Sequence, residues 1–317
     1  METIIGTDIQ VAADLLCKGE LVGIPTETVY GLAANALDSN AVLKIFEAKN
    51  RPAFDPLIVH IAEVSDLEKY SEHVPALAFQ LAEAFWPGPL TILLPKQAII
   101  PDLVTSGLSN VALRIPAHPM TSRLLQTLNF PLAAPSANLF GRVSPTRATH
   151  VKEQLEGRVP YILDGGDCQV GLESTIVGFP PDSLPTVYRL GGTSVEEIQK
   201  VIGEIRIMPH SSSNPQAPGM LKSHYAPGKP LYIKGEDTVL PDSASLLRYR
   251  SYAKNVPIEH QRVLSETGDL REAARNLFAY LRELDQQKTS VIIAELLPEE
   301  GLGKAINDRI RRASVPV

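Results

Sequence analysis

Ile24-Pro-Thr-Glu-Thr-Val-Tyr-Gly-Leu32 opens the stretch that decides the fold, which passes through Ala-Lys-Asn-Arg-Pro at 48–52 and ends with Pro-Leu-Ile-Val-His60. The apolar run at 21–24 predicts a short strand that ends at Pro25 in a hydroxyl-rich turn. A helix should follow, because Asp38 or Ser39 can cap it and apolar residues then recur at helical spacing. The stretch therefore indicates a strand, a helix and a second strand.

Two cations lie at the end of the predicted helix. Lys49 and Arg51 stand beside Pro52, which prevents the helix from continuing, and the strand expected at 57–61 carries His60. The simpler interpretation is that the cations interact with the helix dipole. The alternative is a unit that presents hydroxyl groups, two cations and a histidine to one anionic ligand. The local sequence leaves both interpretations open.

The length and composition indicate a globular chain of two domains. The chain has 317 residues, of which 44% are hydrophobic and 21% charged. It lacks both an apolar run of about 18 residues and a basic, apolar leader, so we expect a cytoplasmic protein with no membrane partner. Cys17 and Cys168 lack metal-ligand spacing. A net charge of −6 argues against a surface that is wholly a nucleic-acid platform, although it allows a local basic cleft.

The remaining pattern alternates helices and strands. Arg114 interrupts an apolar strand, so its side chain must reach either solvent or a buried anion. We interpret Trp86 as a structural plug between a helix and a strand. Helices are expected at 7–18, 64–70, 75–85, 120–128 and 195–202, and strands at 90–94, 111–115, 131–134, 161–163, 171–177 and 186–190.

A change in composition divides the chain. Residues 209–229 are rich in Ser, Asn, Pro and Gly without an apolar period, so they predict a linker between domains at 1–208 and 230–317. The linker retains Lys222, His224 and Tyr225, and we hypothesise that it folds over an ATP cleft as a lid. A passive tether is the alternative.

The last 88 residues predict a smaller α/β domain. Strands are expected at 230–233, 245–249 and 290–296. The clearest helix of the chain runs from Leu270 to Leu284, with Asp269 and Glu272 as a capping pair.

Three ordered segments resemble one known family. The first is the opening stretch; the second is Ala-Pro-Ser136-Ala-Asn138 followed by Ser144-Pro-Thr; the third is Gly171-Leu-Glu-Ser174-Thr-Ile-Val. Together they resemble the Sua5/YrdC/YwlC family, the threonylcarbamoyl-AMP synthases of tRNA modification. The resemblance covers nearly the whole chain and is to the long Sua5 type. It implies an α/β fold with a YrdC-like twisted mixed sheet and a smaller, Rossmann-like α/β Sua5 domain at the C-terminus.

The resemblance also implies a reaction. Members of the family are nucleotidyltransferases that join L-threonine, bicarbonate or CO2, and ATP to give L-threonylcarbamoyladenylate and pyrophosphate, with Mg2+. The implied partner is a downstream tRNA threonylcarbamoyl transferase that modifies adenosine 37, and a weak contact with tRNA is allowed. The chain has neither a Gly-x-x-x-x-Gly-Lys-Ser/Thr loop nor a Gly-x-Gly-x-x-Gly fingerprint. ATP should therefore be held by scattered side chains.

The family's functional residues can be carried over to positions of this sequence. Lys49 and Arg51 would be catalytic, and no protein ligand to a metal is implied. The L-threonine pocket would comprise Thr28, His60, Arg114, the backbone at Ala134, and Ser174. The ATP site would comprise Lys49, Arg51, Asp55, Asn110, Ser136, Asn138, Ser144, Arg189 and Tyr225. Two positions depart from the family, because Asp55 stands where Asn is commoner and Asn110 where Thr or Ser is commoner.

Two other classes of protein remain open. A double-stranded RNA-binding module without turnover could use a concave YrdC-like sheet, but the overall acidity and the absence of aromatic-basic clusters weigh against it. A carbamoyltransferase of hydrogenase maturation shares a YrdC-like domain. That class requires zinc-finger and acylphosphatase modules, for which this chain has neither the cysteines nor the length.

Overall fold

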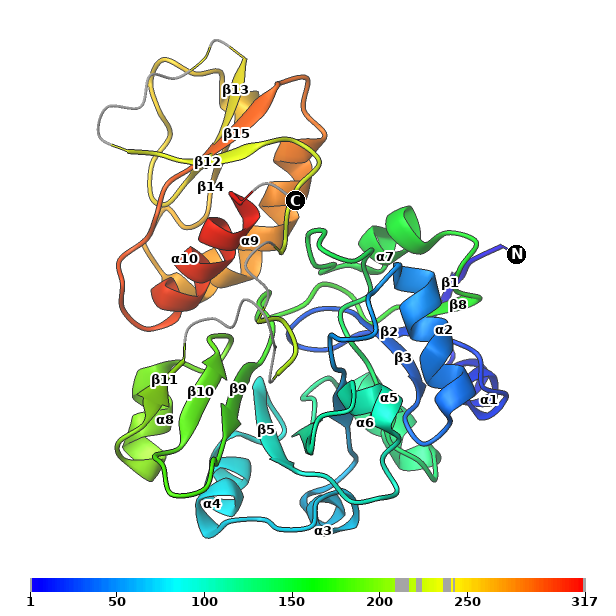
Figure 1. Ribbon diagram of the computed structural model, residues 1–317. Coiled ribbons are helices and arrows are strands. Elements are labelled where there is room, and N and C mark those ends of the chain that lie inside the picture. Colours follow the sequence, from blue (N-terminus) through cyan, green and yellow to red (C-terminus); the bar gives the residue numbers. More distant parts are fainter. Residues whose placement is uncertain (1, 209–216, 221–223, 236–240, 242, 316–317) are drawn as a thin grey trace.

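The computed structural model describes residues 2–208, 217–220, 224–235, 241 and 243–315. These residues form two sheets, and Figure 1 shows the smaller sheet with its helices above the larger one. We call residues 2–208 the N-terminal unit and the described residues from 230 to 315 the C-terminal unit. The expected mixed α/β architecture is confirmed.

The N-terminal unit is built on a mixed sheet, whose described strands are arranged in the order β1-β8-β2-β3-β7-β4-β6-β5-β9-β10-β11. The strands are β1 (Ile4–Gly6), β2 (Val22–Ile24), β3 (Gly31–Asn35), β4 (Ile58–His60), β5 (Leu90–Pro95), β6 (Asn110–Arg114), β7 (Leu132–Ala133), β8 (Tyr161–Leu163), β9 (Thr175–Gly178), β10 (Thr186–Arg189) and β11 (Arg206–Ile207). The helices are α1 (Ile9–Cys17), α2 (Ser39–Lys49), α3 (Leu67–Tyr70), α4 (Ala76–Phe85), α5 (Asp102–Thr105), α6 (Pro119–Thr127), α7 (Ala148–Leu155) and α8 (Val195–Ile202), with a 3-10 turn, η1 (Val64–Asp66), before α3.

The register of two parallel strands prepares the site. β4 and β6 run in the same direction, and His60 lies opposite Arg114 where both strands end. The carboxyl ends of parallel strands meet at one edge of a sheet, which is where ligands bind in many α/β folds. β9 also runs parallel to β5, so the segment that leads into β9 arrives near the same region.

Local signals act largely as expected. The Asp38 side chain caps α2 by accepting from the Asn40 amide, and the helix ends at Asn50 in the left-handed conformation. Trp86 is buried, and its indole nitrogen donates to the Leu90 carbonyl at 2.7 Å, as expected for a structural plug.

Several elements carry no sequence signal strong enough to predict them. β3 is rich in Gly and Ala rather than β-branched residues, and its Leu32, Ala33 and Ala34 are fully buried. α10 is polar in composition although several of its polar residues are buried. The other unexpected elements are β1, α5, α7, β11 and β14.

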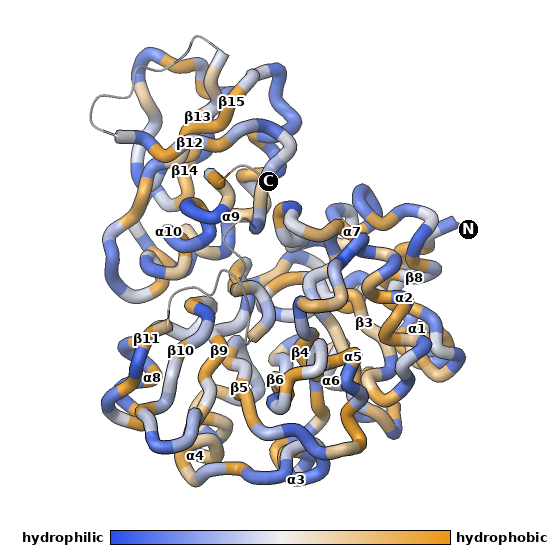
Figure 2. Tube along the Cα trace, in the orientation of Figure 1, coloured by the Kyte–Doolittle hydropathy of each residue, from blue (hydrophilic) through white to orange (hydrophobic). Residues whose placement is uncertain are grey.

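The C-terminal unit is a parallel sheet with two helices. Its strands are β12 (Leu231–Ile233), β13 (Ala244–Arg248), β14 (Gln261–Val263) and β15 (Val291–Ala294), and among the described residues their order is β12-β15-β13-β14. A short 3-10 turn, η2 (Ile258–His260), precedes β14. Helices α9 (Leu270–Asp285) and α10 (Leu302–Ala313) lie between this sheet and the N-terminal unit (Figure 1). Figure 2 shows the contrast between the hydrophobic strands β13 and β15 and the largely hydrophilic α10.

The expected capping pair of α9 is only half correct. The Asp269 side chain accepts from the Arg271 and Glu272 amides, as an N-cap should. The Glu272 carboxylate does not reach back to Asp269 but accepts from the Ser265 hydroxyl at 2.5 Å, and that same hydroxyl oxygen accepts from the Asp269 amide. Ser265 therefore takes the role that a capping box would give to Glu272.

An apolar cluster joins the two units. Val29, Val143 and Leu172 of the N-terminal unit pack in one core with residues of α9 and α10, among them Leu277 and Phe278. Much of the predicted linker, 209–216 and 221–223 with Lys222, lies outside the described residues, so the linker and lid hypotheses stay predictions. Among the described helices, none is both long and apolar enough to cross a membrane.

The cap of α9 gives a first testable prediction. Asp269→Ala should reduce the free energy of unfolding by about 1 kcal/mol, because two amides of the first turn lose their acceptor. Hydrogen exchange should become faster at Arg271 and Glu272. Asp38→Ala is the matched control, since it should speed exchange in α2 only. Unchanged exchange in α9 of the Asp269→Ala variant would contradict this account.

Candidate functional site

One cavity lies at the carboxyl ends of β4 and β6. Its walls come from the turn after β2, from the ends of β4, β6 and β10, from the segments after β7 and before β9, and from two described pieces of the linker. The lining residues that the argument uses are Thr28, Arg51, His60, Arg114, Ala134, Ser136, Glu173, Ser174, Arg189, His224 and Tyr225. Residues that are far apart in the sequence therefore meet around one cavity.

All five residues predicted to bind L-threonine line this cavity. They are Thr28, His60, Arg114, Ala134 and Ser174. Four of the nine residues predicted for ATP line it too, namely Arg51, Ser136, Arg189 and Tyr225. The fold thus brings together the two predicted halves of a bimolecular site, although their roles stay predictions.

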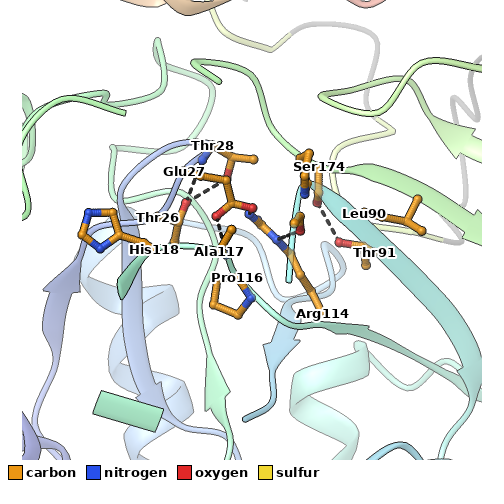
Figure 3. A network of polar contacts seen from close by, with 12 residues as sticks. Thr26, Glu27, Thr28, Leu90, Thr91, Arg114, Pro116, Ala117, His118 and Ser174 are labelled. Atoms are coloured by element: carbon orange, nitrogen blue, oxygen red, sulfur yellow. Dashed lines mark hydrogen bonds and ion pairs between the residues drawn. The ribbon is translucent and has the colours of Figure 1, made fainter. Parts of the chain in front are cut away.

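Arg114 finds its buried anion in Glu27. Its Nη2 donates to Glu27 Oε1 at 2.6 Å, and its Nε donates to the Gly88 carbonyl at 3.2 Å. The second oxygen of Glu27 accepts from the Ala117 amide at 3.0 Å. Figure 3 shows this network beside the Thr26–Thr28 turn. Arg114 is therefore oriented before any ligand arrives, by a residue that sequence reasoning did not select.

Ser174 connects the two predicted halves. Its Oγ lies 2.7 Å from the Thr91 hydroxyl and accepts from Arg189 Nη2 at 3.0 Å (Figure 3 shows the contact with Thr91). The Ser174 carbonyl accepts from Arg189 Nε, also at 3.0 Å. Burial lowers the pKa of Arg189 to about 10, so the guanidinium stays charged at neutral pH. A residue predicted for the amino acid thus touches one predicted for the nucleotide.

His60 is a neutral member of the cavity wall. Burial, followed by the nearby Arg114 charge, lowers the pKa of His60 to about 3. Its Nδ1 is buried and has no hydrogen-bond partner among the residues that the structure describes. The same holds for Nδ1 of His224, another lining residue whose pKa is lowered by burial and then by Arg312. Two uncharged imidazoles therefore face a space that can hold a polar ligand.

The side chains of Lys49 and Arg51 donate to carbonyls that lie outside α2. Lys49 Nζ donates to the carbonyls of Ser136 and Asn138 at 2.6 and 2.5 Å, and Arg51 donates to those of Asp55 and Pro56. The side chains of both cations are buried, and burial lowers their pKa values. Lys49 lies in the last turn of α2, so the helix-dipole interpretation stays open, but the bonds of Lys49 also join α2 to the segment after β7. Arg51 faces the cavity, whereas Lys49 lies behind the Ser136 loop.

The remaining predicted ATP residues lie outside the cavity lining. The Asp55 carboxylate pairs with Arg51 at 2.9 Å, so it has a cation without Mg2+. Asn138 donates to the Leu139 and Arg142 carbonyls, and Ser144 donates to Glu173 Oε1 at 2.5 Å. Asn110 begins β6 and lies opposite Pro95, at the end of the strand away from Arg114. The structure therefore does not bring Asn110 to the cavity.

Sequence reasoning missed two carboxylates at this site. Glu27 and Glu173 each sit inside a quoted motif, directly beside a selected residue. The available signal was their position, because a carboxylate within an apolar, hydroxyl-rich segment must be paired when buried. Their partners, Arg114 and Arg309, lie 87 and 136 residues away, so the sequence could not name them.

The fold and the cavity define a two-unit α/β protein in which Arg51, Arg114 and Arg189 line one cavity. Residues 14–191 match the Sua5/YciO/YrdC family model, described as telomere recombination, and residues 193–315 match the model of the C-terminal domain of threonylcarbamoyl-AMP synthase. The chain therefore belongs to the Sua5 family of threonylcarbamoyl-AMP synthases, which are nucleotidyltransferases. The resemblance expected from the three motifs is confirmed.

Individual relatives match over nearly the full length. The chain is 44% identical to the threonylcarbamoyl-AMP synthase of Pyrococcus abyssi, over 96% of this chain and 94% of that protein. It is 40% identical to the threonylcarbamoyl-AMP synthase of Bacillus subtilis, over 96% and 92%. The crystal structure of P. abyssi Sua5 complexed with L-threonine is similar with a TM-score of 0.90 at 41% identity, covering 99% of this chain and 98% of that one.

The neutral state of His60 gives a second prediction. Because the pKa of the folded state lies near 3 and the ordinary value is 6.5, the unfolded chain binds the extra proton as pH falls below 6.5. Relative to His60→Gln, the unmodified chain should lose about 2 kcal/mol of unfolding free energy between about pH 6.5 and pH 5. Urea unfolding of both proteins across this range measures the difference. If unfolding free energy depends on pH in the same way for both proteins, His60 takes up its proton in the fold as it does in the unfolded chain.

Proposed function

We propose that this chain forms L-threonylcarbamoyl-AMP and pyrophosphate from L-threonine, bicarbonate or CO2, and ATP. The observation that carries the proposal is the contact between Ser174 and Arg189, which joins the predicted amino-acid and nucleotide halves in one cavity. The relatives that match over nearly the full length are named for this activity. The product would supply a tRNA threonylcarbamoyl transferase, and a cytoplasmic location stays an expectation from the sequence.

The proposed chemistry has two steps. The neutral amine of threonine attacks CO2, forms an N–C bond and releases a proton, which gives a carbamate. A carbamate oxygen then attacks the α-phosphorus of ATP, and the bond to the pyrophosphate oxygen breaks. Arg51 and Arg189 are the cations suited to the charge that develops on the phosphates, and holding the reactants together can lower the barrier by about 7 to 11 kcal/mol.

The residues of the amino-acid half suit threonine in charge and polarity. The Arg114 guanidinium, held by Glu27, is a fitting partner for a carboxylate. His60 is uncharged, so it offers hydrogen bonding without repelling the ammonium form of the amino acid. We therefore assign Thr28, His60, Arg114, Ala134 and Ser174 to threonine, and the cationic side of the cavity to ATP. Lys49, Asp55, Asn138 and Ser144 would act by supporting that side, and Asn110 is the assignment with least support.

Mg2+ would enter as a part of the nucleotide substrate. In the described part of the chain, no group of three or more His, Cys, Asp or Glu side chains could hold a metal ion. The carboxylate that lines the cavity, Glu173, already pairs with Arg309, and Asp55 pairs with Arg51. Mg2+ commonly binds substrate phosphates and water with few protein ligands, so this donor set is compatible with MgATP but forms no metal centre of its own.

The two other classes of protein are not favoured. A double-stranded RNA-binding module would not need a cavity lined by two buried, neutral histidines, His60 and His224. The match of residues 193–315 to the C-terminal domain of threonylcarbamoyl-AMP synthase favours the synthase over a hydrogenase-maturation carbamoyltransferase. We also propose the division into a catalytic domain at 1–208, a linker at 209–229 and a Sua5 domain at 230–317.

The reaction itself is the third prediction. Purified protein should release pyrophosphate only when L-threonine, bicarbonate, Mg2+ and ATP are all present, because the carbamate is the nucleophile and cannot form without the amine. A coupled pyrophosphate assay with each component omitted in turn is the measurement. Equal release without threonine would mean that the chain hydrolyses ATP rather than adenylating a carbamate.

The fourth prediction separates the two halves. Arg114→Lys should weaken threonine binding by about 1.5 to 3 kcal/mol, because lysine keeps the charge but loses the paired geometry toward a carboxylate. Binding of a non-hydrolysable ATP analogue should change much less, since Arg114 bonds to Glu27 and Gly88 rather than to the nucleotide side. Calorimetry with each ligand measures both affinities. A larger loss for the nucleotide would mean that the two halves are exchanged.

A further inference from the structure

Glu173 is a buried carboxylate at the centre of the junction between the two units. It lines the cavity, directly precedes Ser174, and accepts from the Ser144 hydroxyl through Oε1 and from Arg309 Nε through Oε2 at 2.9 Å. Burial alone would raise the pKa of this carboxyl group, but Arg309, Arg189 and the Ser144 hydroxyl lower it below its ordinary value. Glu173 is therefore charged and depends on cations for that state.

Arg309 comes from α10 of the C-terminal unit, and its side chain is fully buried. Besides Glu173, it donates to the Leu190 carbonyl at 2.7 Å, and its guanidinium lies 4.9 Å from the centre of the Tyr225 ring. Glu173 precedes Ser174 in the chain and Leu190 follows Arg189. The Arg309 side chain thus contacts the residues next to Ser174 and Arg189, which bond to each other in the cavity wall. It also contacts a third cavity residue, Tyr225.

The loop that carries Glu173 is also shaped by α9. Gly171 has a φ of +73°, and a Cβ there would lie 2.5 Å from the Arg275 Cα, so the loop backbone rests directly on the helix. Arg282 of α9 is buried and donates to the carbonyls of Val143 and Ser144. The Ser144–Glu173 pair is therefore held from two helices of the C-terminal unit.

We propose that Arg309 is a positioning residue for the nucleotide half of the site, supplied by the C-terminal unit. The inference rests on the proposed function. Arg309 touches no reacting atom in this arrangement and acts through Glu173, Leu190 and Tyr225, which set the places of Ser144, Arg189 and the Tyr225 ring. The C-terminal unit is then a working part of the site rather than an attached module.

The same helix offers a matched control. Lys304 of α10 pairs with Glu196 of α8 at 2.6 Å, so this ion pair also joins the two units. Its two side chains are 30% and 41% exposed, and neither lines the cavity. If Arg309 only docks the two units, substitutions of Lys304 and of Arg309 should lower nucleotide affinity alike. If Arg309 positions the site, only its substitution should lower nucleotide affinity.

The experiment measures nucleotide affinity and turnover in full-length variants. Arg309→Met should weaken binding of a non-hydrolysable ATP analogue, measured by calorimetry. It should also slow threonine-dependent pyrophosphate release by about 100-fold, because misplaced groups sharply reduce such rates. Arg309→Lys should lose less, since it keeps the charge but not the fork that reaches Glu173 and Leu190 together. Lys304→Met should change nucleotide affinity by less than about 3-fold, as expected for a partly exposed ion pair.

A pH profile distinguishes positioning from loss of structure. Without Arg309, burial of Glu173 is less opposed, so the pKa of this carboxyl group should rise and protonation should begin at higher pH. The affinity of Arg309→Met for the ATP analogue should therefore fall more with decreasing pH than the affinity of the unmodified chain does. The double variant Glu173→Gln/Arg309→Met should lose this added pH dependence, because the amide does not titrate.

The outcomes separate the inference from the proposed function. If Arg309→Met and Lys304→Met bind the nucleotide analogue equally well, or if Arg309→Met gains no pH dependence, Arg309 is only a docking residue and the inference fails. If Arg309→Met and Lys304→Met lose affinity to the same degree, the inference fails as well. If the unmodified chain binds the analogue, if this binding depends on Arg309, and if no pyrophosphate is released, the positioning role stands and the proposed reaction fails.

Discussion

The ion pair between Glu173 and Arg309 is the interaction on which the arrangement of this protein depends. Removing two charges from water is costly, and such a pair is tolerated only when further bonds satisfy both groups. Here the Ser144 hydroxyl satisfies the carboxylate, and the Asp308 carboxylate, the Leu190 carbonyl and the Tyr225 ring satisfy the guanidinium. The carboxylate belongs to one unit and the cation to the other. The same contacts therefore dock the two units and hold the cavity wall in place.

The same physical device recurs around the cavity. Arg114 is held by Glu27 and Arg51 by Asp55, so each cation that faces the cavity has a bonded partner behind it. Arg189 is held by the Ser174 carbonyl and hydroxyl instead of by a carboxylate. Fixed donors of this kind stabilise developing negative charge without reorganising during a reaction. A chain with a net charge of −6 can therefore present a cationic cavity, because its acidic residues support the cations.

The sequence predicts what is local and misses what depends on distant partners. Helices with an apolar face and a cap, such as α8 and α9, were foreseen, since their signals lie within one segment. β3, with its small residues, and α10, with its buried Arg309, were not, because their environment is supplied by other parts of the fold. Motif resemblance located nine of the lining residues, but the supporting carboxylates Glu27 and Glu173 acquire their partners only through long-range contacts.

The proposed reaction needs its reactants held in contact more than it needs a strong base. The buried imidazole of His60 stays neutral beside Arg114, so the half proposed for the amino acid has one cation beside an uncharged histidine. Ser174 then links that half to Arg189 through two hydrogen bonds at 3.0 Å. If a ligand in one half displaces Ser174, the Arg189 guanidinium in the other half must move with it. The two halves therefore share one rigid element, and Glu173, adjacent in the chain, ties that element to the C-terminal unit.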